Sequence, residues 1–280
     1  MEKNIQNINK SLNHGGIDYL DFLRAMDERL RPRSYLEIGT RWGESLACFR
    51  CAAVCVDPEF QLASSALTAR GETHLFQMTS DEFFAGVDVR RLLPRGPDVA
   101  FLDGLHWFEY LLRDFINVEA AAHPGTIILL HDCLPLNARM ALREFIAGPA
   151  SEPTRLAWTG DVWKMLFVLK KFRPDLDVRA LDCSPTGLIL VTNLDPGSDV
   201  LATRYEQALS AFGGWTLDAE TLDQLWELYP LLDSRAVLDQ ADGLHHLGLR
   251  RFPPACTPAA VADLRAAFAQ RAHRRLAIAG

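Results

Sequence analysis

The chain has 280 residues, a formal net charge of −7 and a mean hydropathy of −0.01. This length suits one α/β core with an appended segment, since single cores stop growing at roughly 250–300 residues. No apolar run approaches the roughly 20 residues that span a bilayer, the polar first residues lack the apolar middle of a secretory signal, and the negative charge disfavours nucleic-acid binding. We therefore expect a cytoplasmic protein without a membrane or nucleic-acid partner, although a local basic patch is left open.

Apolar residues at helical spacing predict a first helix over 17–30, which Pro32 stops. Short apolar runs then predict strands at 34–38, 53–56, 73–77, 98–102 and 126–130. Segments of helical length lie between them at 43–50, 61–70, 80–87 and 108–122. Connections of this length join parallel strands through crossovers, so the pattern indicates a mostly parallel sheet that helices cover on both faces.

The pattern changes after the fifth strand. Helices are predicted at 137–147 and 162–172, and two strands at 177–182 and 187–192 are joined so tightly that they form an antiparallel hairpin. Further helices are predicted at 199–212, 219–229, 234–241 and 258–277. The expected fold is α/β, a doubly wound, Rossmann-like sheet of seven strands with a closing hairpin, in a domain at 1–195 followed by a helical extension at 196–280.

Six cysteines occur in the chain, and three of them form the pattern CxxCxxxC: Cys48, Cys51 and Cys55. A structural zinc site requires four ligands, and no fourth ligand lies nearby in the sequence. Without a secretory context, we expect reduced thiols that pack as small apolar side chains.

The first strand leads into a glycine loop with the sequence ExGxxxG, formed by Glu37, Gly39 and Gly43. Glycine at a turn from strand to helix allows close approach of a ligand. Asp57 ends the second strand, where an acid can accept both ribose hydroxyls of a nucleoside. The loop lacks the second glycine of GxGxxG that admits a pyrophosphate, so a cofactor with adenine and ribose but no pyrophosphate fits better.

These motifs, with FLDG at 101–104 and the closing hairpin, resemble class I S-adenosylmethionine-dependent methyltransferases. More narrowly, DGLHWFEYLLRDF at 103–115 and PGTIILLHD at 124–132 resemble methyltransferase domain 24, which includes small-molecule and sugar O-methyltransferases. The resemblance spans about residues 15–195. It implies S-adenosylmethionine as cofactor, with the loop facing its methionine part, Asp57 its ribose, and Thr79 or Ser80 its adenine. The implied cofactor-binding residues are Glu37, Gly39, Thr40, Gly43, Asp57, Thr79, Ser80 and Asp103.

Four titratable residues follow the fourth and fifth predicted strands, so we expect them at one edge of the sheet: Asp103, His106, His131 and Asp132. Related O-methyltransferases place Mg²⁺ at comparable positions, which implies Asp103, His131 and Asp132 as ligands of Mg²⁺ or another divalent cation. The His-Asp pair departs from the oxygen ligands of the metal-dependent relatives, so metal dependence stays open. His106, with Asp103, is the expected catalytic pair, and His131 is the alternative base if no cation binds.

The segment at 158–176 often covers the acceptor in this fold. Asp161, Trp163 and Lys164 are candidates for substrate contact, with a helix cap and core packing as the alternative. Trp42 and Trp107 flank the site loops and either wall the cofactor pocket or pack.

The sequence thus predicts methyl transfer to a hydroxyl of a small molecule or sugar-containing metabolite, in a chain whose C-terminal helices are candidates for homo-oligomer contacts. Two alternatives remain: an NAD(P)-dependent oxidoreductase on a related sheet, and a non-catalytic domain that binds the cofactor or a partner.

Overall fold

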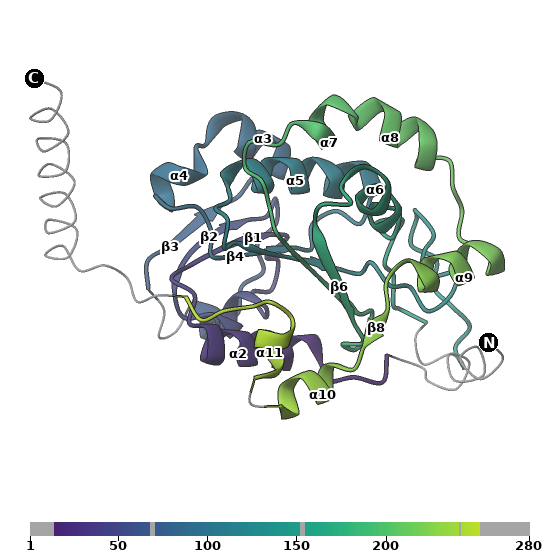
Figure 1. Cartoon of the computed structure of the whole chain (residues 1–280), viewed down its shortest axis with the longest axis horizontal. Coiled ribbons are helices and arrows are strands. Elements are labelled where there is room, and N and C mark those ends of the chain that lie inside the picture. The colour runs from purple at the N-terminus through teal and green to yellow at the C-terminus, as the bar shows by residue number, and fades with distance from the viewer. Residues whose placement is uncertain (1–13, 68–70, 152–154, 241, 253–280) are drawn as a thin grey trace, which may run out of the picture.

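A single β-sheet forms the centre of the computed structural model, which describes residues 14–67, 71–151, 155–240 and 242–252 (Figure 1). Its strands are β1 (Ser34–Ile38), β2 (Ala52–Val56), β3 (Thr73–Phe76), β4 (Val99–Leu102), β5 (Ile127–His131), β6 (Asp177–Leu181), β7 (Leu188–Thr192) and β8 (Leu231–Leu232). Their order across the sheet is β3-β2-β1-β4-β5-β7-β6-β8. The first five strands are parallel, and β7 is antiparallel to both β5 and β6. The predicted doubly wound α/β fold with its closing hairpin is confirmed.

Within the described ranges the sheet has eight strands instead of the predicted seven. The additional strand, β8, comes from the C-terminal segment and pairs in parallel with β6. It contains two residues, too few for the alternating apolar pattern by which a strand is recognised in a sequence. Only its pairing with the exposed side of β6 makes it a strand.

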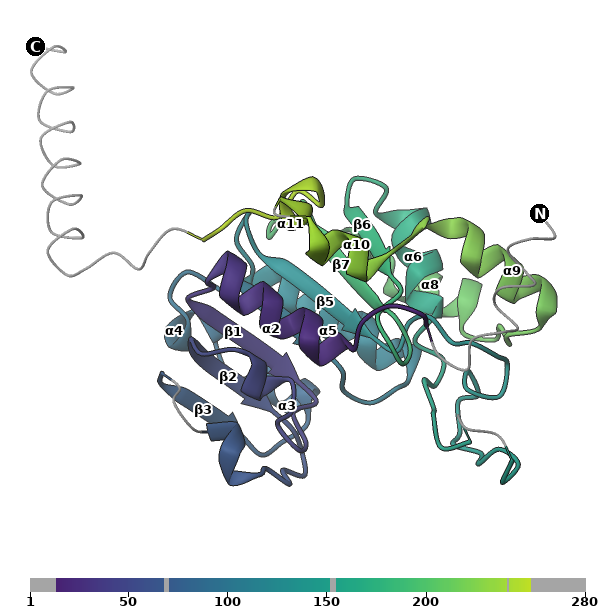
Figure 2. The ribbon, with the colours of Figure 1, turned by 90° about the horizontal axis from the view of Figure 1, so that it is seen from below.

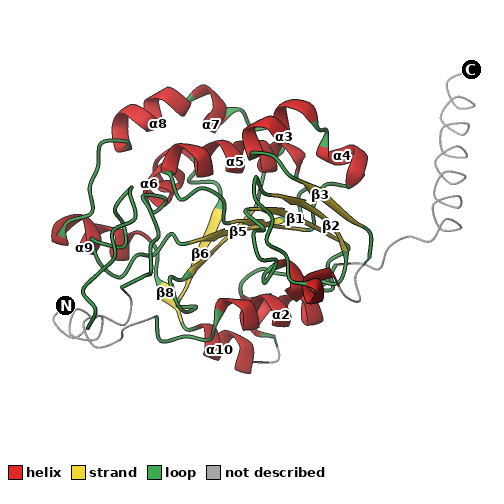
Figure 3. Cartoon of the chain, turned by 180° about the vertical axis from the view of Figure 1, so that it is seen from behind, coloured by secondary structure: helices red, strands yellow, loops and turns green. Residues whose placement is uncertain are grey.

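Helices cover both faces of the sheet (Figures 2 and 3). One face carries α2 (Tyr19–Leu30), α10 (Ser234–Asp239) and α11 (Gly243–His246). The other carries α3 (Ser80–Gly86), α4 (Val89–Leu92), α5 (Phe108–Ala121), α6 (Lys164–Phe172), α7 (Val200–Thr203), α8 (Tyr205–Phe212) and α9 (Ala219–Leu228). Because successive side chains of a strand point to opposite faces, Leu36 and Ile38 of β1 enter the core under α5 while Tyr35 enters the core under α2.

Two predicted helices, at 43–50 and 61–70, are replaced by short 3-10 turns where the structure describes them. These turns are η1 (Leu46–Cys48) and η2 (Ser64–Leu67). In the first, the amide of Cys48 donates to the carbonyl of Ser45 and that of Phe49 to the carbonyl of Leu46. Bonds across three residues tighten the backbone and cannot extend into a long helix. The glycine loop is therefore followed by a compact turn, not by a regular crossover helix.

The predicted helix at 137–147 is also wrong, because this segment forms turns. Side chains from elsewhere occupy main-chain carbonyls that a helix would use internally. The indole of Trp158 donates to the carbonyl of Leu142, and the indole of Trp107 donates to the carbonyl of Arg143. Apolar periodicity could not reveal this competition, because both donors lie outside the segment.

Residues after 195 contribute helices α7 to α11 and strand β8. Leu201, Phe212 and Leu225 lie in the core on the α5 side of the sheet, while Leu244 lies in the core on the α2 side. The domain boundary at 195 stays a prediction, and the predicted helix at 258–277 lies outside the described residues. No helix in the described ranges has the length and apolar character to cross a membrane.

Candidate functional site

The carboxyl ends of four neighbouring strands lie side by side at one edge of the sheet. Ile38 of β1 is in register with Val56 of β2 and Leu102 of β4, and Leu102 is in register with Leu130 of β5. The residues that follow these positions are brought to the same edge: Gly39, Asp57, Asp103 and His131. Ligands of open α/β sheets bind outside this edge, so the register places the predicted site residues together.

A cavity of about 460 Å³ opens at this edge of the sheet. Its volume falls in the range of small-molecule sites, roughly 300–1,000 Å³. Of the predicted cofactor-binding, catalytic and metal-binding residues, all except Glu37 line it: Gly39, Thr40, Gly43, Asp57, Thr79, Ser80, Asp103, His106, His131 and Asp132. Glu37 is fully buried and accepts a hydrogen bond from the hydroxyl of Ser45, which does line the cavity. The structure therefore places Glu37 behind the cavity wall.

Gly39 allows the turn after β1 to pass against the turn after β4. Its φ angle is +90°, and a Cβ atom at this position would lie 1.9 Å from the carbonyl oxygen of Asp103. Its amide donates to the carbonyl of Val56, 2.9 Å away. A side chain is excluded here both by the left-handed backbone and by the approach of Asp103, so this part of the cavity wall is bare backbone.

Asp57 connects the turns after β1 and β2. Its carboxylate accepts hydrogen bonds from the amide of Arg41 at 2.8 Å and from the amide of Glu59 at 2.7 Å. The side chain is thereby held in one orientation beside the cavity. Each carboxylate oxygen can accept a second hydrogen bond, so the group retains the capacity to bind a pair of hydroxyls.

Thr79 and Ser80 line the cavity at the start of α3. Thr79 is the N-cap residue: its hydroxyl accepts from the amide of Glu82 at 3.3 Å and donates to the Glu82 carboxylate at 2.9 Å. The hydroxyl proton of Thr79 is used within this capping box and is not available to a ligand. Thr79 therefore contributes mainly to the shape of the cavity wall. Ser80 lines the cavity, and its hydroxyl partly offsets the burial that raises the pKa of Asp114 to about 7.

Two aspartates and two histidines lie close together in the wall of the cavity. His106 Nε2 lies 3.4 Å from Asp103 Oδ1 and 3.2 Å from Asp132 Oδ2. His131 Nδ1 lies 3.2 Å from the same oxygen of Asp103 and 3.4 Å from the same oxygen of Asp132. One oxygen of each carboxylate is therefore shared by both imidazoles, and we call these four residues the Asp/His cluster.

Burial and charge oppose each other in the Asp/His cluster. Burial raises the pKa of both carboxyls, but the facing imidazoles outweigh it and hold the pKa of Asp103 and Asp132 below the usual 3.8. Burial lowers the pKa of both imidazoles, but the carboxylates outweigh it and raise the pKa of His106 and His131 above the usual 6.5. The cluster therefore stabilises positive charge at its centre.

A divalent cation bound by these side chains would supply that positive charge. The donor atoms of Asp103, His131 and Asp132 all lie within 4.8 Å of one another, and within the described ranges this is the one group of three such ligands. Nε2 of His131 is buried without a hydrogen-bond partner. Two carboxylates and an imidazole are a donor set that Mn²⁺, Fe²⁺ or Zn²⁺ accepts more readily than Mg²⁺, which prefers oxygen alone.

The backbone around residues 158–161 holds His106 in place. Nδ1 of His106 donates to the carbonyl of Trp158 at 3.1 Å, since a carbonyl can only accept. The amide of Asp161 donates to the carbonyl of His106 at 3.1 Å, and Gly160 packs against the same carbonyl. In the neutral imidazole this leaves Nε2 as the basic atom, facing the two carboxylates.

Part of the chain, which includes these residues, matches a known protein family. Residues 36–133 match a family described as a methyltransferase domain. This matched segment covers about a third of the chain. It contains all the predicted cofactor-binding, catalytic and metal-binding residues, from Glu37 to Asp132, and the resemblance inferred from the motifs at 103–115 and 124–132 is confirmed. No curated protein matches the chain.

Solved structures give a more distant likeness. The methyltransferase PaMTH1 of Podospora anserina, bound to SAH, is 14% identical, with a TM-score of 0.44 over 63% of this chain and 78% of that chain. The O-methyltransferase TomG of Streptomyces achromogenes, in complex with SAM, is 17% identical, with a TM-score of 0.44 over 63% and 80%. An O-methyltransferase of Bacillus cereus, in complex with SAH, is 16% identical, with a TM-score of 0.40 over 62% and 79%. These values are too low to bear on the reaction of this chain.

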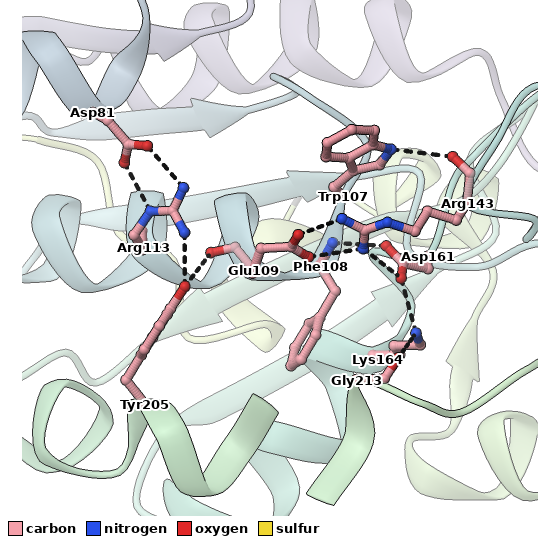
Figure 4. Close-up of polar contacts among 10 residues, drawn as sticks. All are labelled: Asp81, Trp107, Phe108, Glu109, Arg113, Arg143, Asp161, Lys164, Tyr205 and Gly213. Atoms are coloured by element: carbon pink, nitrogen blue, oxygen red, sulfur yellow. Dashed lines mark hydrogen bonds and ion pairs between the residues drawn. The ribbon is translucent and has the colours of Figure 1, made fainter. Parts of the chain in front are cut away.

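A polar network around Asp161 connects α5 to α6 (Figure 4). Asp161 accepts hydrogen bonds from the amide of Phe108 at 2.7 Å, from Lys164 Nζ at 2.8 Å and from Arg143 Nη1 at 3.2 Å. Lys164 also donates to the carbonyl of Gly213 at 2.7 Å. Asp161 therefore caps α5 and joins it to α6. This is the helix-capping role that the sequence left open as the alternative to substrate contact.

The remaining candidates of the 158–176 segment also lie away from the cavity. Trp163 is fully buried and Lys164 is 3% exposed, and neither lines the cavity. Trp107 does not line it either, since its ring packs under the guanidinium of Arg143. Trp42 does line the cavity and is half exposed, so it is the tryptophan placed to contact a ligand bound there.

Sequence reasoning missed Tyr19, which reaches the cavity from α2. Its ring lies 4.3 Å from the imidazole of His131, centroid to centroid. Burial, reinforced by the charges of Asp103 and Asp132, raises the pKa of its hydroxyl, so this group stays a neutral hydrogen-bond donor. Tyr19 precedes the matched segment and lies on an amphipathic helix, where an aromatic residue indicates core packing and carries no signal of a site.

Proposed function

We propose that this chain transfers the methyl group of S-adenosylmethionine to a hydroxyl oxygen of a small molecule or sugar-containing metabolite. The observation that carries the proposal is the cavity itself. In a domain of the methyltransferase family, it joins bare backbone at Gly39, an oriented carboxylate at Asp57 and the Asp/His cluster within about 460 Å³. A nucleoside site and a proton-accepting site are thus adjacent.

The residues present fit the cofactor. The backbone turn at Gly39 would accept its methionine part, which a side chain there would obstruct. Asp57 would accept hydrogen bonds from the two ribose hydroxyls, and Ser80 would border the adenine. When bound, S-adenosylmethionine supplies an electrophilic methyl group on a positively charged sulfur.

The Asp/His cluster would prepare the acceptor. As the acceptor oxygen forms its bond to the methyl carbon and the bond from carbon to sulfur breaks, the hydroxyl proton would pass to Nε2 of His106. Asp103 and Asp132 stabilise the resulting imidazolium, and the carbonyl of Trp158 keeps Nδ1 protonated throughout. Positioning of acceptor and methyl group in line would supply the larger part of the rate enhancement.

Asp103, His131 and Asp132 would hold a divalent cation, which would acidify the acceptor hydroxyl. In that case Nε2 of His106 lies close enough to the same carboxylate oxygens to act as base beside the cation. If no cation binds, His131 is less suited to be the base than His106, because its imidazole is fully enclosed by the two carboxylates and Tyr19. The absence of a membrane or nucleic-acid partner, the cytoplasmic location and contacts between C-terminal helices of two copies remain predictions.

Calorimetry with S-adenosylhomocysteine and with NAD tests the cofactor assignment. We expect saturable binding of S-adenosylhomocysteine alone. Asp57→Asn removes the charge but keeps the shape, and should weaken that binding about tenfold or more, since hydrogen bonds to charged groups are strong. Asp21→Asn, on the exposed side of α2, is the matched control and should bind normally. Binding of NAD alone would replace this proposal by the oxidoreductase alternative.

Methyl transfer is then measured as release of S-adenosylhomocysteine from S-adenosylmethionine over a panel of hydroxylated compounds. His106→Asn should slow transfer by roughly 10²–10⁴-fold, the usual worth of a general base, and leave S-adenosylhomocysteine affinity unchanged. Undiminished transfer by this variant would remove His106 from the mechanism. A chain that binds the cofactor but methylates none of the panel would favour the non-catalytic alternative.

A further inference from the structure

A second cleft, of about 680 Å³, lies where the parallel strands begin, at the edge of the sheet opposite the candidate active site. Arg33, directly before β1, lines it together with the turn at 123–126 that precedes β5. Arg95, before β4, and the segment at 248–252 complete the wall. No predicted site residue lines this cleft, so it is separate from the cavity at the carboxyl ends.

Positive charge exceeds negative charge in this cleft. Arg33 forms a two-pronged ion pair with the buried Asp98, through Nε at 2.8 Å and Nη2 at 2.7 Å. Asp177, the carboxylate that lines the cleft, is paired with Arg179 at 2.9 Å. The cleft contains three further arginines, all exposed: Arg95, Arg250 and Arg251. Within the described ranges no carboxylate forms an ion pair with any of these three.

The backbone that carries two of these arginines is fixed on both sides. Leu249 is 2% exposed and its amide donates to the carbonyl of Leu244 at 3.0 Å. Phe252 is 8% exposed, its amide donates to the carbonyl of Leu30 at 2.8 Å, and its ring packs edge-on against His123. Arg250 and Arg251 therefore project from an anchored segment, which lowers the entropy cost of binding a ligand there.

We propose that this cleft binds the phosphate groups of a phosphorylated small molecule. Guanidinium groups bind phosphate through paired hydrogen bonds, and three uncompensated positive charges match the two to four negative charges of a phosphate ester or pyrophosphate. The whole chain carries a net charge of −7, so its overall field repels anions and the attraction must come from these arginines at short range. The volume of the cleft exceeds that of a phosphate alone and leaves room for the remainder of a small metabolite.

Titration calorimetry of the full chain with inorganic pyrophosphate tests the proposal, with EDTA present so that metal chelation contributes nothing. We expect saturable binding at one site. The double variant Arg250→Ala/Arg251→Ala should weaken it about tenfold or more. Arg95→Ala, on a different segment, should also weaken it, so the proposal remains testable if the double variant fails to fold.

The matched control is Arg91→Ala/Arg204→Ala, which removes the same charge from exposed positions outside the cleft. It should bind pyrophosphate as the unaltered chain does. Equal weakening by both double variants, or equal binding of sulfate at the same ionic strength, would mean that a general charge effect explains the binding and would overturn the proposal. Absence of saturable binding would also overturn it. So would cleft-dependent binding of a short single-stranded oligonucleotide that is tighter than that of pyrophosphate, because the cleft would then be a nucleic-acid site.

Discussion

Gly160 packs so closely against His106 that a Cβ atom on Gly160 would lie 1.8 Å from the carbonyl oxygen of His106. The two residues are far apart in the sequence, and the backbone between Trp158 and Asp161 forms hydrogen bonds to both the ring and the carbonyl of His106. The orientation of the proposed base thus depends on a segment after β5 that contributes no side chain of its own to the cavity's lining.

Gly160→Ala should therefore destabilise the protein and displace His106. The φ angle of Gly160 is +61°, where a side chain costs about 1–3 kcal/mol, and the clash adds to that cost. Urea unfolding measures the loss of stability. Gly86→Ala is the control, because a Cβ atom there meets nothing within 4 Å and alanine at the end of α3 should be neutral or stabilising. Equal stability of the two variants would contradict the close contact.

The Asp/His cluster should bind a divalent cation. We expect calorimetry to show one site for Mn²⁺ or Zn²⁺ and weaker binding of Mg²⁺, because His131 supplies nitrogen to the donor set. Asp132→Asn should weaken binding about tenfold or more, as loss of a charged ligand removes a strong interaction. His74→Gln, which alters an imidazole on β3 outside the cluster, should leave binding unchanged. If EDTA-treated protein takes up no cation, the four groups serve only as paired charges.

Asp114 makes stability depend on pH. Burial raises its pKa to about 7 from 3.8, so the folded protein holds a proton that the unfolded chain has already released between roughly pH 4 and 7. The free energy of unfolding therefore falls as pH rises through this window. Asp114→Asn removes the effect, and its stability relative to the unaltered chain should increase by about 2–3 kcal/mol between pH 5 and pH 8.

Urea unfolding of both proteins at these two pH values measures the difference. Asp21→Asn, an exposed carboxyl on α2, serves as the control and should give the same difference at both pH values. A constant difference for Asp114→Asn as well would show that the buried carboxyl does not gain its proton in this range.

Lys164→Met should destabilise the protein by about 3 kcal/mol, because it leaves the carboxylate of Asp161 buried without its closest cation. The double variant with Asp161→Asn should lose less than the sum of the two single variants, since the charges compensate each other. Lys170→Met, on the exposed side of the same helix, should change stability by no more than about 0.5 kcal/mol. Additive losses at Asp161 and Lys164 would contradict their coupling.

The sequence by itself determined the first five strands, their parallel arrangement and the edge of the sheet at which the candidate site lies. Strand runs of four or five residues are recognised by composition alone, and in a parallel sheet their carboxyl ends must meet, so Gly39, Asp57, Asp103 and His131 could be placed together from their positions after the strands. A short motif that directly follows a strand lies at the end of that strand, so these residues could be selected from the sequence alone.

The tertiary structure decided what depends on contacts between distant segments. Glu37 belongs to the motif yet is directed behind the cavity, because Ser45 binds its carboxylate. Tyr19 enters the cavity from a helix that periodicity assigns to the core, and β8 exists only through its pairing with β6. Arg95 and Arg250 share a cleft although more than half of the chain's length separates them. Local patterns encode the elements, whereas side-chain direction and long-range neighbours follow from how those elements pack.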